Sequence, residues 1–170
     1  MKFILFFSIL ALAGTCNEPE SRAPMTQEEI DERLIEVNKQ MLASEGARID
    51  KFIEDNEWPM KSTGTGLRYW IYEDIEGELV NKGNVVEITF ELTLLDGAVI
   101  HRTEETETRS FRIEGSNVET GLHEALQLMS VGDKAKFILP SHLAHGLIGD
   151  QKNIPPKSSI IYDVNLIGVQ

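Results

Sequence analysis

The sequence lacks several features that would point to common enzyme classes. Cys16 is its only cysteine, so no disulfide can form within the chain. It has no glycine-rich phosphate loop, no paired-cysteine metal motif and no G-x-S-x-G nucleophile elbow. The apolar stretch from Phe3 to Ala13 is too short to span a bilayer, for which roughly 20 residues are needed. The sequence therefore gives no sign of nucleotide, thiol-metal or serine-hydrolase chemistry.

Basic residues are also scarce. The 170 residues include 16 Lys and Arg against 28 Asp and Glu, which gives a net charge of -12. Such a charge repels phosphate backbones and anionic membrane surfaces, and therefore argues against a nucleic-acid partner. A hydrophobic fraction of 41% is in the ordinary globular range and predicts one domain of about 100 to 150 residues with an appendage.

The first residues form a targeting segment. Residues 1–16 carry Lys2, an apolar stretch and then small residues that lead to Cys16, a pattern typical of a secretory signal. The position of Cys16 after "LAGT" resembles a bacterial lipoprotein processing site, where the thiol would receive a diacylglycerol. A plain signal peptide with a free cysteine is the alternative. We expect an exported lipoprotein, anchored to a membrane of the cell envelope and followed by a flexible tether over residues 17–25.

A helical segment is predicted over residues 26–61. Thr26 and Glu29 form a capping-box pattern. Apolar residues then recur at helical spacing, at Ile30, Leu34, Val37, Met41, Ile49, Phe52 and Ile53. The pattern predicts one long helix or two consecutive helices over about residues 27–57, with Glu45 among the acidic residues of the polar face. Either the following domain or a second copy of the chain must cover the apolar stripe, and the second alternative predicts a homodimer through residues 26–57.

In the remainder, residues 62–170, apolar and polar residues alternate with a period of two. This pattern predicts an antiparallel sheet. The expected strands cover about residues 67–72, 86–94, 111–113, 134–139 and 160–166, and Asp96-Gly97 predicts a hairpin turn. In the strand over residues 134–139, Ala135, Phe137 and Leu139 alternate with Lys134, Lys136 and Ile138. Ser116 and Glu119 suggest the start of a short helix that ends before Gly132. The fold class is α+β, a sheet covered by one short helix.

Histidines and carboxylates offer few alternatives for chemistry. His142 and His145 have an H-x-x-H spacing that could join a metal site with His101 or His123, but polar loop histidines without a metal are far commoner. The carboxylates near Glu104, Glu105 and Glu107 have no apolar neighbours to raise a pKa, so we expect a solvated loop. We predict neither a metal nor a cofactor.

Several landmarks in order resemble a known family. The stretch "LHEALQLMSVGDKAKFILPSHLAHGLIGDQKNIPPKSSIIYDVNLIGV" runs from a short helix through M-x-V-G and a Lys-rich strand to an I-P-P loop and a Y-D-V-x-L strand. It resembles the FK506-binding-protein (FKBP) type of peptidyl-prolyl cis-trans isomerase over roughly residues 66–169. The whole chain is similar to lipoproteins of gliding Bacteroidetes that carry a helical segment before such a domain. The resemblance implies an FKBP-like fold and isomerisation of X–Pro bonds in polypeptide clients.

The resemblance also implies a set of pocket residues. Five occupy positions expected to act on the X–Pro bond while it rotates, namely Phe90, His101, Phe111, Ile154 and Tyr162. Five more are expected to bind substrate, namely Ile100, Val118, Glu119, Leu122 and His145. In the family, the residue matching Ile154 places its backbone N–H near the substrate, and the residue matching Glu119 donates its own N–H to ligands.

Half of these positions depart from the family pattern. His101 replaces an Asp, His145 a Tyr, and Ile100 a Phe. Leu122 replaces the Trp of the pocket floor, and Glu119 replaces an apolar residue. These changes predict a shallower, more polar pocket with weak macrolide binding and low turnover. The alternatives are a non-enzymatic chaperone or peptide-binding module with the same fold, and a purely structural lipoprotein.

Overall fold

The computed structural model describes residues 25–104 and 107–170. The predicted signal peptide, Cys16 and nearly all of the tether lie outside these residues, as does Glu105. One compact unit spans Val37–Gln170, and the described residues before Val37 belong to a separate unit. The first helix from Val37 onward therefore belongs to the same unit as the sheet of residues 62–170. In the described ranges no helix is long and apolar enough to cross a membrane.

The helical segment forms a single helix, α1, over Gln27–Asp55. Its capping box is formed, because the Glu29 N–H donates to Thr26 Oγ1 at 3.3 Å and the Thr26 N–H donates to Glu29 Oε2 at 2.8 Å. The helix continues through Gly46 without a break.

Among the described residues, the sheet has seven antiparallel strands and confirms the α+β prediction. The strands are β1 (Lys61–Ser62), β2 (Arg68–Glu73), β3 (Val85–Leu94), β4 (Val99–Arg102), β5 (Arg109–Arg112), β6 (Lys134–Leu139) and β7 (Ile160–Val169). Their order is β1-β2-β6-β7-β3-β4, and β5 also pairs with β3. Asp96-Gly97 makes the predicted turn between β3 and β4, with Gly97 at a φ of 87°.

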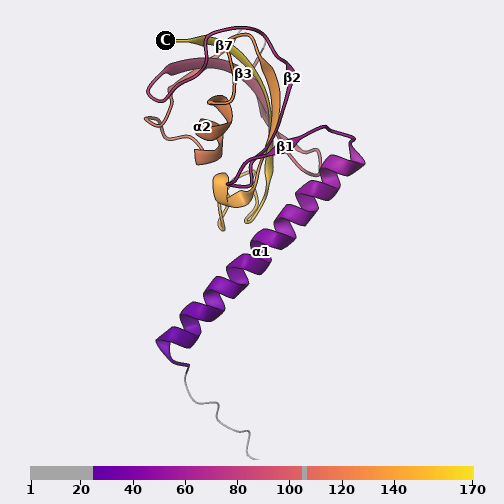
Figure 1. Cartoon of the computed structure of the whole chain (residues 1–170), viewed down its shortest axis with the longest axis vertical. Helices are drawn as coiled ribbons and strands as arrows, with labels where there is room; N and C mark the ends of the chain where they lie inside the picture. Colours follow the sequence, from indigo (N-terminus) through magenta and orange to yellow (C-terminus); the bar gives the residue numbers. More distant parts are fainter. Residues whose placement is uncertain (1–24, 105–106) are drawn as a thin grey trace, which may run out of the picture. The chain divides into compact units, whose positions relative to one another are not determined.

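A short helix, α2 (Thr120–Leu126), lies in the hollow of the curved sheet (Figure 1). Glu119 is its N-cap but makes no side-chain capping bond, so the capping box predicted with Ser116 is wrong. The Ser116 hydroxyl instead accepts the Arg112 N–H at 2.9 Å in the preceding turn. Leu122, Ala125 and Leu126 are buried against the sheet and form the main core.

The opposite face of the sheet has a second, smaller core. Successive residues of a strand point to opposite faces, so Phe137 and Tyr162 join the main core while their neighbours Ile138 and Ile161 face away. Ile49 of α1 packs against these two isoleucines and is fully buried. Ile138 is therefore buried although it alternates into the same face as Lys134 and Lys136, because α1 covers that part of the sheet.

Candidate functional site

Cross-strand pairing brings the central site residues together. Leu92 of β3 lies opposite His101 of β4 on one side and opposite Tyr162 of β7 on the other. Residues opposite each other in an antiparallel pair share a face of the sheet. The Phe90 ring contacts both neighbours, with centroid distances of 5.3 Å to His101 and 5.2 Å to Tyr162. A cluster of three rings therefore lies on the concave face.

The other apolar candidates surround this cluster. Leu122, Ile154 and Tyr162 are almost completely buried in the main core. Four half-buried side chains pack against the same core, namely Phe90, Ile100, Phe111 and Val118. Buried members form a rigid floor, whereas half-buried members leave apolar surface that a ligand can cover. The structure thus brings the predicted apolar residues to one place, although their individual roles remain predictions.

Glu119 links the polar candidates. Its Oε1 lies 2.8 Å from His145 Nε2, and both side chains are largely covered. Its carboxylate also lies beside the Tyr162 hydroxyl. Burial, followed by the negative charge of Glu119 and a hydrogen bond to it, raises the pKa of Tyr162 well above its usual range. Glu119, at the start of α2, therefore connects His145 in the loop before β7 with Tyr162 on β7 in one polar group.

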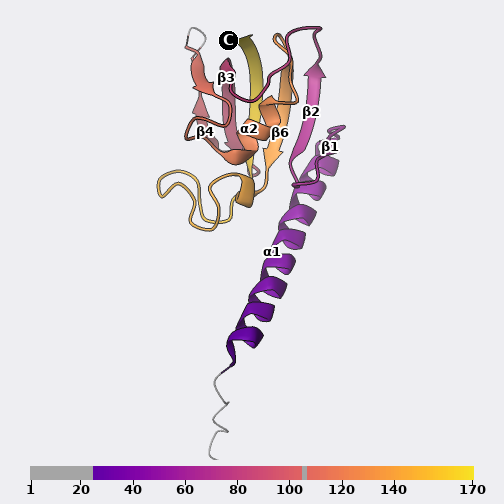
Figure 2. The same ribbon diagram turned by 60° about the vertical axis from the view of Figure 1, so that its left-hand side comes forward.

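The long loop between β6 and β7 carries Ile154 and His145 (Figure 2). Asp150 organises its tip, because its Oδ1 accepts the backbone N–H groups of Lys152, Asn153 and Ile154 at 2.7 to 2.9 Å. The bonds from Ile154 and then Lys152 lower the pKa of the Asp150 carboxyl. Gly149 passes close to Ile154, since a Cβ there would meet the Ile154 carbonyl oxygen at 2.1 Å.

This arrangement bears on the two backbone N–H groups that are expected to reach a substrate. The Ile154 N–H donates to Asp150 at 2.7 Å, so it is not directed at a substrate in this structure. Within the described ranges, no atom accepts the backbone N–H of Glu119 at the start of α2. Pro155 and Pro156 are exposed, so the apolar wall comes from Ile154 itself.

The histidines considered for a metal site do not meet. His142 Nε2 is 3.0 Å from the Thr65 carbonyl oxygen, whereas His145 contacts Glu119. His123 lies between the Glu114 N–H and the Ser116 carbonyl oxygen. Across residues 25–104 and 107–170, no three His, Cys, Asp or Glu side chains converge as metal ligands.

Two residues of this region were not predicted from the sequence. Asp150 had a recognisable signal, because Asp followed by polar residues often accepts backbone N–H groups in turns. Glu45 was assigned to the polar face of α1, but its side chain is 2% exposed and accepts hydrogen bonds from Ser141 and Ser159. Its signal was its spacing, since it lies four residues after Met41 and four before Ile49 in the apolar stripe.

Comparison with known proteins identifies the family. The family model for FKBP-type peptidyl-prolyl cis-trans isomerase matches residues 76–167. The FKBP-type 22 kDa isomerase of Escherichia coli is 31% identical over 144 residues, which cover 83% of this chain and 69% of that protein. The chain belongs to the FKBP-type peptidyl-prolyl cis-trans isomerases.

Longer FKBP-type relatives and solved structures agree with this assignment. FkpA of Escherichia coli is 28% identical over 173 residues, which cover 94% of this chain and 63% of that protein. The chain thus spans less than two thirds of the length of FkpA. The crystal structure of FkpA superposes with a TM-score of 0.62 at 29% identity, covering 86% of this chain and 74% of the chain in that structure. An isomerase structure from Pseudomonas syringae gives a TM-score of 0.65 at 25% identity, covering 78% and 95%.

Proposed function

We propose that this chain catalyses cis–trans isomerisation of X–Pro bonds in exported protein clients and so assists their folding, through the FKBP-type domain over residues 62–170. The observation that carries this proposal is the half-buried apolar group on the concave face, namely Phe90, Ile100, Phe111 and Val118. It lies in a domain of a family defined by this activity.

The chemistry needs little more than such a surface. Rotation about the X–Pro bond faces a barrier of about 18 to 20 kcal/mol from amide resonance, whereas the two end states differ by about 0.5 to 1 kcal/mol. No bond is made or broken, so no nucleophile is required. An apolar surface that prefers the twisted, less conjugated amide lowers the barrier. The unpaired Glu119 N–H is the donor that we assign to a substrate carbonyl.

A refolding assay on a proline-limited substrate tests this function. Phe111→Ala removes a half-buried ring from the surface, and we expect it to reduce the acceleration about tenfold or more. Ile167→Ala is the matched control, because Ile167 is an exposed apolar residue at the far end of β7. Equal rates for the wild type, Phe111→Ala and the uncatalysed reaction would refute the enzymatic function.

The rival function is peptide binding without turnover, as in a chaperone. Two observations favour it: the Ile154 N–H is occupied by Asp150, and the Glu119–His145 pair adds polar groups beside the rings. Such a module would bind Pro-containing peptides and leave their isomerisation rate unchanged. Titration with a labelled proline peptide, together with the refolding assay, separates the two functions, and absence of any binding would favour a structural lipoprotein.

We also propose that the chain is exported and held at a membrane of the cell envelope through a lipid on Cys16. A named relative, the "Outer membrane protein MIP" of Legionella longbeachae, is 28% identical over 164 residues and supports an envelope location. Metabolic labelling with a radioactive fatty acid should mark the wild type and not Cys16→Ser. Equal labelling of both would contradict the anchor.

A homodimer through α1 is the last part of the proposal. The stripe residues after Gly46 pack in the second core, whereas Ile30, Leu34 and Val37 are exposed. The proposed dimer contact is therefore narrower than residues 26–57 and is confined to the part of α1 before Gly46. Sedimentation should show a dimer that Leu34→Glu dissociates. A monomeric wild type would contradict it.

A further inference from the structure

Glu45 is the most deeply buried carboxylate on α1, with 2% of its surface exposed. It accepts three hydrogen bonds: from the Ser141 N–H at 2.7 Å, the Ser141 hydroxyl at 2.9 Å and the Ser159 hydroxyl at 2.7 Å. A buried carboxylate is costly unless such donors replace its water. Short charge-assisted bonds also fix geometry more firmly than neutral ones.

The two serines lie at the two ends of the loop between β6 and β7. Ser141 begins the segment after Pro140, and Ser159 is the last residue before β7. Both are buried, with exposures of 4% and 5%. One carboxylate therefore joins both ends of the loop to α1 from the convex side of the sheet, while the loop carries Ile154 and His145 to the concave side.

The loop is braced internally, so its ends determine where its tip lies. The Gly146 N–H donates to the Ser141 carbonyl oxygen at 2.7 Å, and the Lys157 N–H donates to the Gly146 carbonyl oxygen at 3.0 Å. Asp150 accepts the Ile154 N–H. A chain of bonds thus runs from Glu45 through Ser141 and Gly146 to Lys157, three residues after Ile154.

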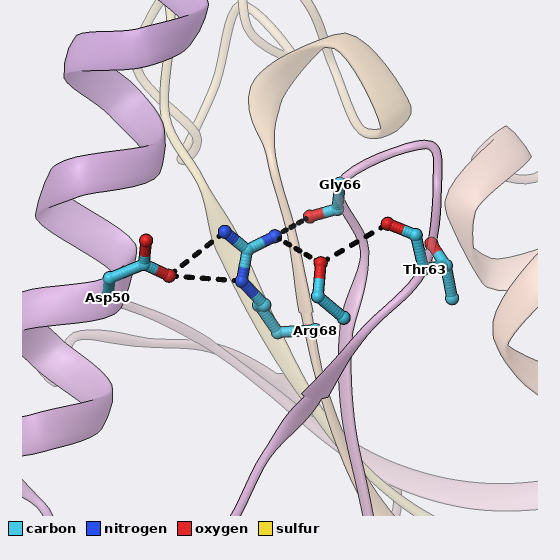
Figure 3. Close-up of polar contacts among 5 residues, drawn as sticks. Asp50, Thr63, Gly66 and Arg68 are labelled. Carbon is cyan, nitrogen blue, oxygen red and sulfur yellow. Dashed lines mark hydrogen bonds and ion pairs between the residues drawn. The ribbon is translucent and has the colours of Figure 1, made fainter.

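A second contact attaches α1 to the domain without touching this loop. The Arg68 guanidinium contacts Asp50 Oδ1 at 2.9 and 3.1 Å, and donates to the Gly66 carbonyl oxygen at 2.7 Å (Figure 3). This contact joins the helix to β2 and the preceding turn. It therefore provides a means to separate general docking of α1 from the specific contact of Glu45 with the loop.

We propose that Glu45 is a positioning residue for the prolyl site: by binding Ser141 and Ser159, it lets α1 set the position of the loop that carries Ile154 and His145. The inference rests on the proposed isomerase function, and it adds α1 to the parts of the chain that determine substrate binding. Glu45 itself touches no substrate, because it lies on the other side of the sheet.

The test compares three variants of the full chain. Glu45→Leu keeps a similar volume but leaves the serine donors without an acceptor, and a displacement of about 1 Å in a site can cost about a hundredfold in rate. We expect kcat/KM for a proline peptide, measured by exchange NMR, to fall about tenfold, with most of the change in KM. Glu45→Gln retains an acceptor for the loop and should stay within about threefold of the wild type.

Asp50→Asn is the control, since it weakens the contact with Arg68 and leaves the loop bonds intact. It should leave kcat/KM unchanged. An equal loss in Asp50→Asn and Glu45→Leu would overturn the proposal, because docking of the helix in general would then explain both. Unchanged kcat/KM in Glu45→Leu would overturn it as well.

Amide hydrogen exchange makes the test independent of catalysis. Exchange at the N–H groups of Ile154 and Lys157 should accelerate about tenfold in Glu45→Leu. Ser159→Ala removes only one hydroxyl and serves as the milder variant if Glu45→Leu does not fold. It should accelerate the same exchange by a smaller factor. Unchanged protection in a folded Glu45→Leu, or in Ser159→Ala if the leucine variant does not fold, refutes the positioning role. A wild type that shows this protection but no isomerase activity refutes the proposed function alone.

Discussion

The two halves of α1 share one apolar pattern but have different surroundings. In the first half, Ile30, Leu34 and Ile35 are exposed, with 37% to 62% of their surface accessible. In the second half, Ile49 is fully buried and packs with Phe52 and Ile53 against the sheet. The comparison shows that helical periodicity identifies an apolar face without identifying what covers it.

The reason lies in the sheet. Ile138 and Ile161 face away from the main core, and a second apolar layer has to cover them. The second half of α1 provides this layer, so its apolar side chains contribute to the stability of the whole domain. The first half depends on its own hydrogen bonds and on whatever covers its stripe.

The largest expected difference between the halves concerns their apolar side chains. Ile49→Ala should lower the free energy of unfolding by about 2 to 5 kcal/mol, because it leaves a cavity between α1 and the sheet. Ile35→Ala should change it by less than about 0.5 kcal/mol, because Ile35 is exposed and lies outside the stripe proposed for the dimer. Urea unfolding followed by tryptophan fluorescence measures both. Equal effects of the two substitutions would show that the halves do not differ.

A smaller difference is expected between tertiary and local ion pairs of the second half. Arg68→Ala should cost about 1 to 3 kcal/mol, since it removes bonds to Asp50, to the Gly66 carbonyl oxygen and to Ser62 from a mostly covered side chain. Lys51→Ala breaks only the exposed pair with Asp55 and should cause no measurable change in the same unfolding experiment. A larger loss in Lys51→Ala than in Arg68→Ala would contradict this ranking.

The smallest effect is expected at the start of α1. The Thr26 backbone N–H and then its hydroxyl lower the pKa of the Glu29 carboxyl from its ordinary value of 4.5. Because the folded pKa is depressed, the capping contribution is present above that ordinary value and is lost as the pH falls through the folded pKa. Protection of the first-turn amides, corrected for the intrinsic pH dependence of exchange, should fall in acid, and protection in the second half of α1 should not follow it.

Thr26→Ala serves as the control for this pH dependence. It removes the hydroxyl that accepts the Glu29 N–H, so the first turn should exchange faster at neutral pH and respond less to acid. If acid loosened both halves of α1 together, α1 would behave as one cooperative unit and the comparison would fail.

Strand and turn prediction succeeded where local chemistry decides the structure. The alternation in β3 and β7 and the Asp96-Gly97 turn follow from side-chain period and backbone preference. The helix start at Ser116 was wrong because its hydroxyl bonds the Arg112 N–H in the preceding turn, a choice between two local partners that spacing alone does not settle.

The candidate site was predictable only in part. Family landmarks located the positions that the structure brings together, among them Phe90, Tyr162 and His101. They did not reveal that Asp150 occupies the Ile154 N–H or that Glu119 contacts His145. The bond to Asp150 is local to the loop and had a turn signal. The contact between Glu119 and His145 joins distant segments, so it depends on how the loop and α2 meet.

The sequence by itself determined the elements, the identity of the apolar faces and the family, because period, turn chemistry and ordered motifs are properties of neighbouring residues. Only the tertiary structure decided which part of α1 is buried, and that Glu45 is an interior acceptor and not a surface charge. The physical reason is that burial and hydrogen-bond partners come from segments far apart in the chain: Glu45 meets its partners across sequence separations of 96 and 114 residues.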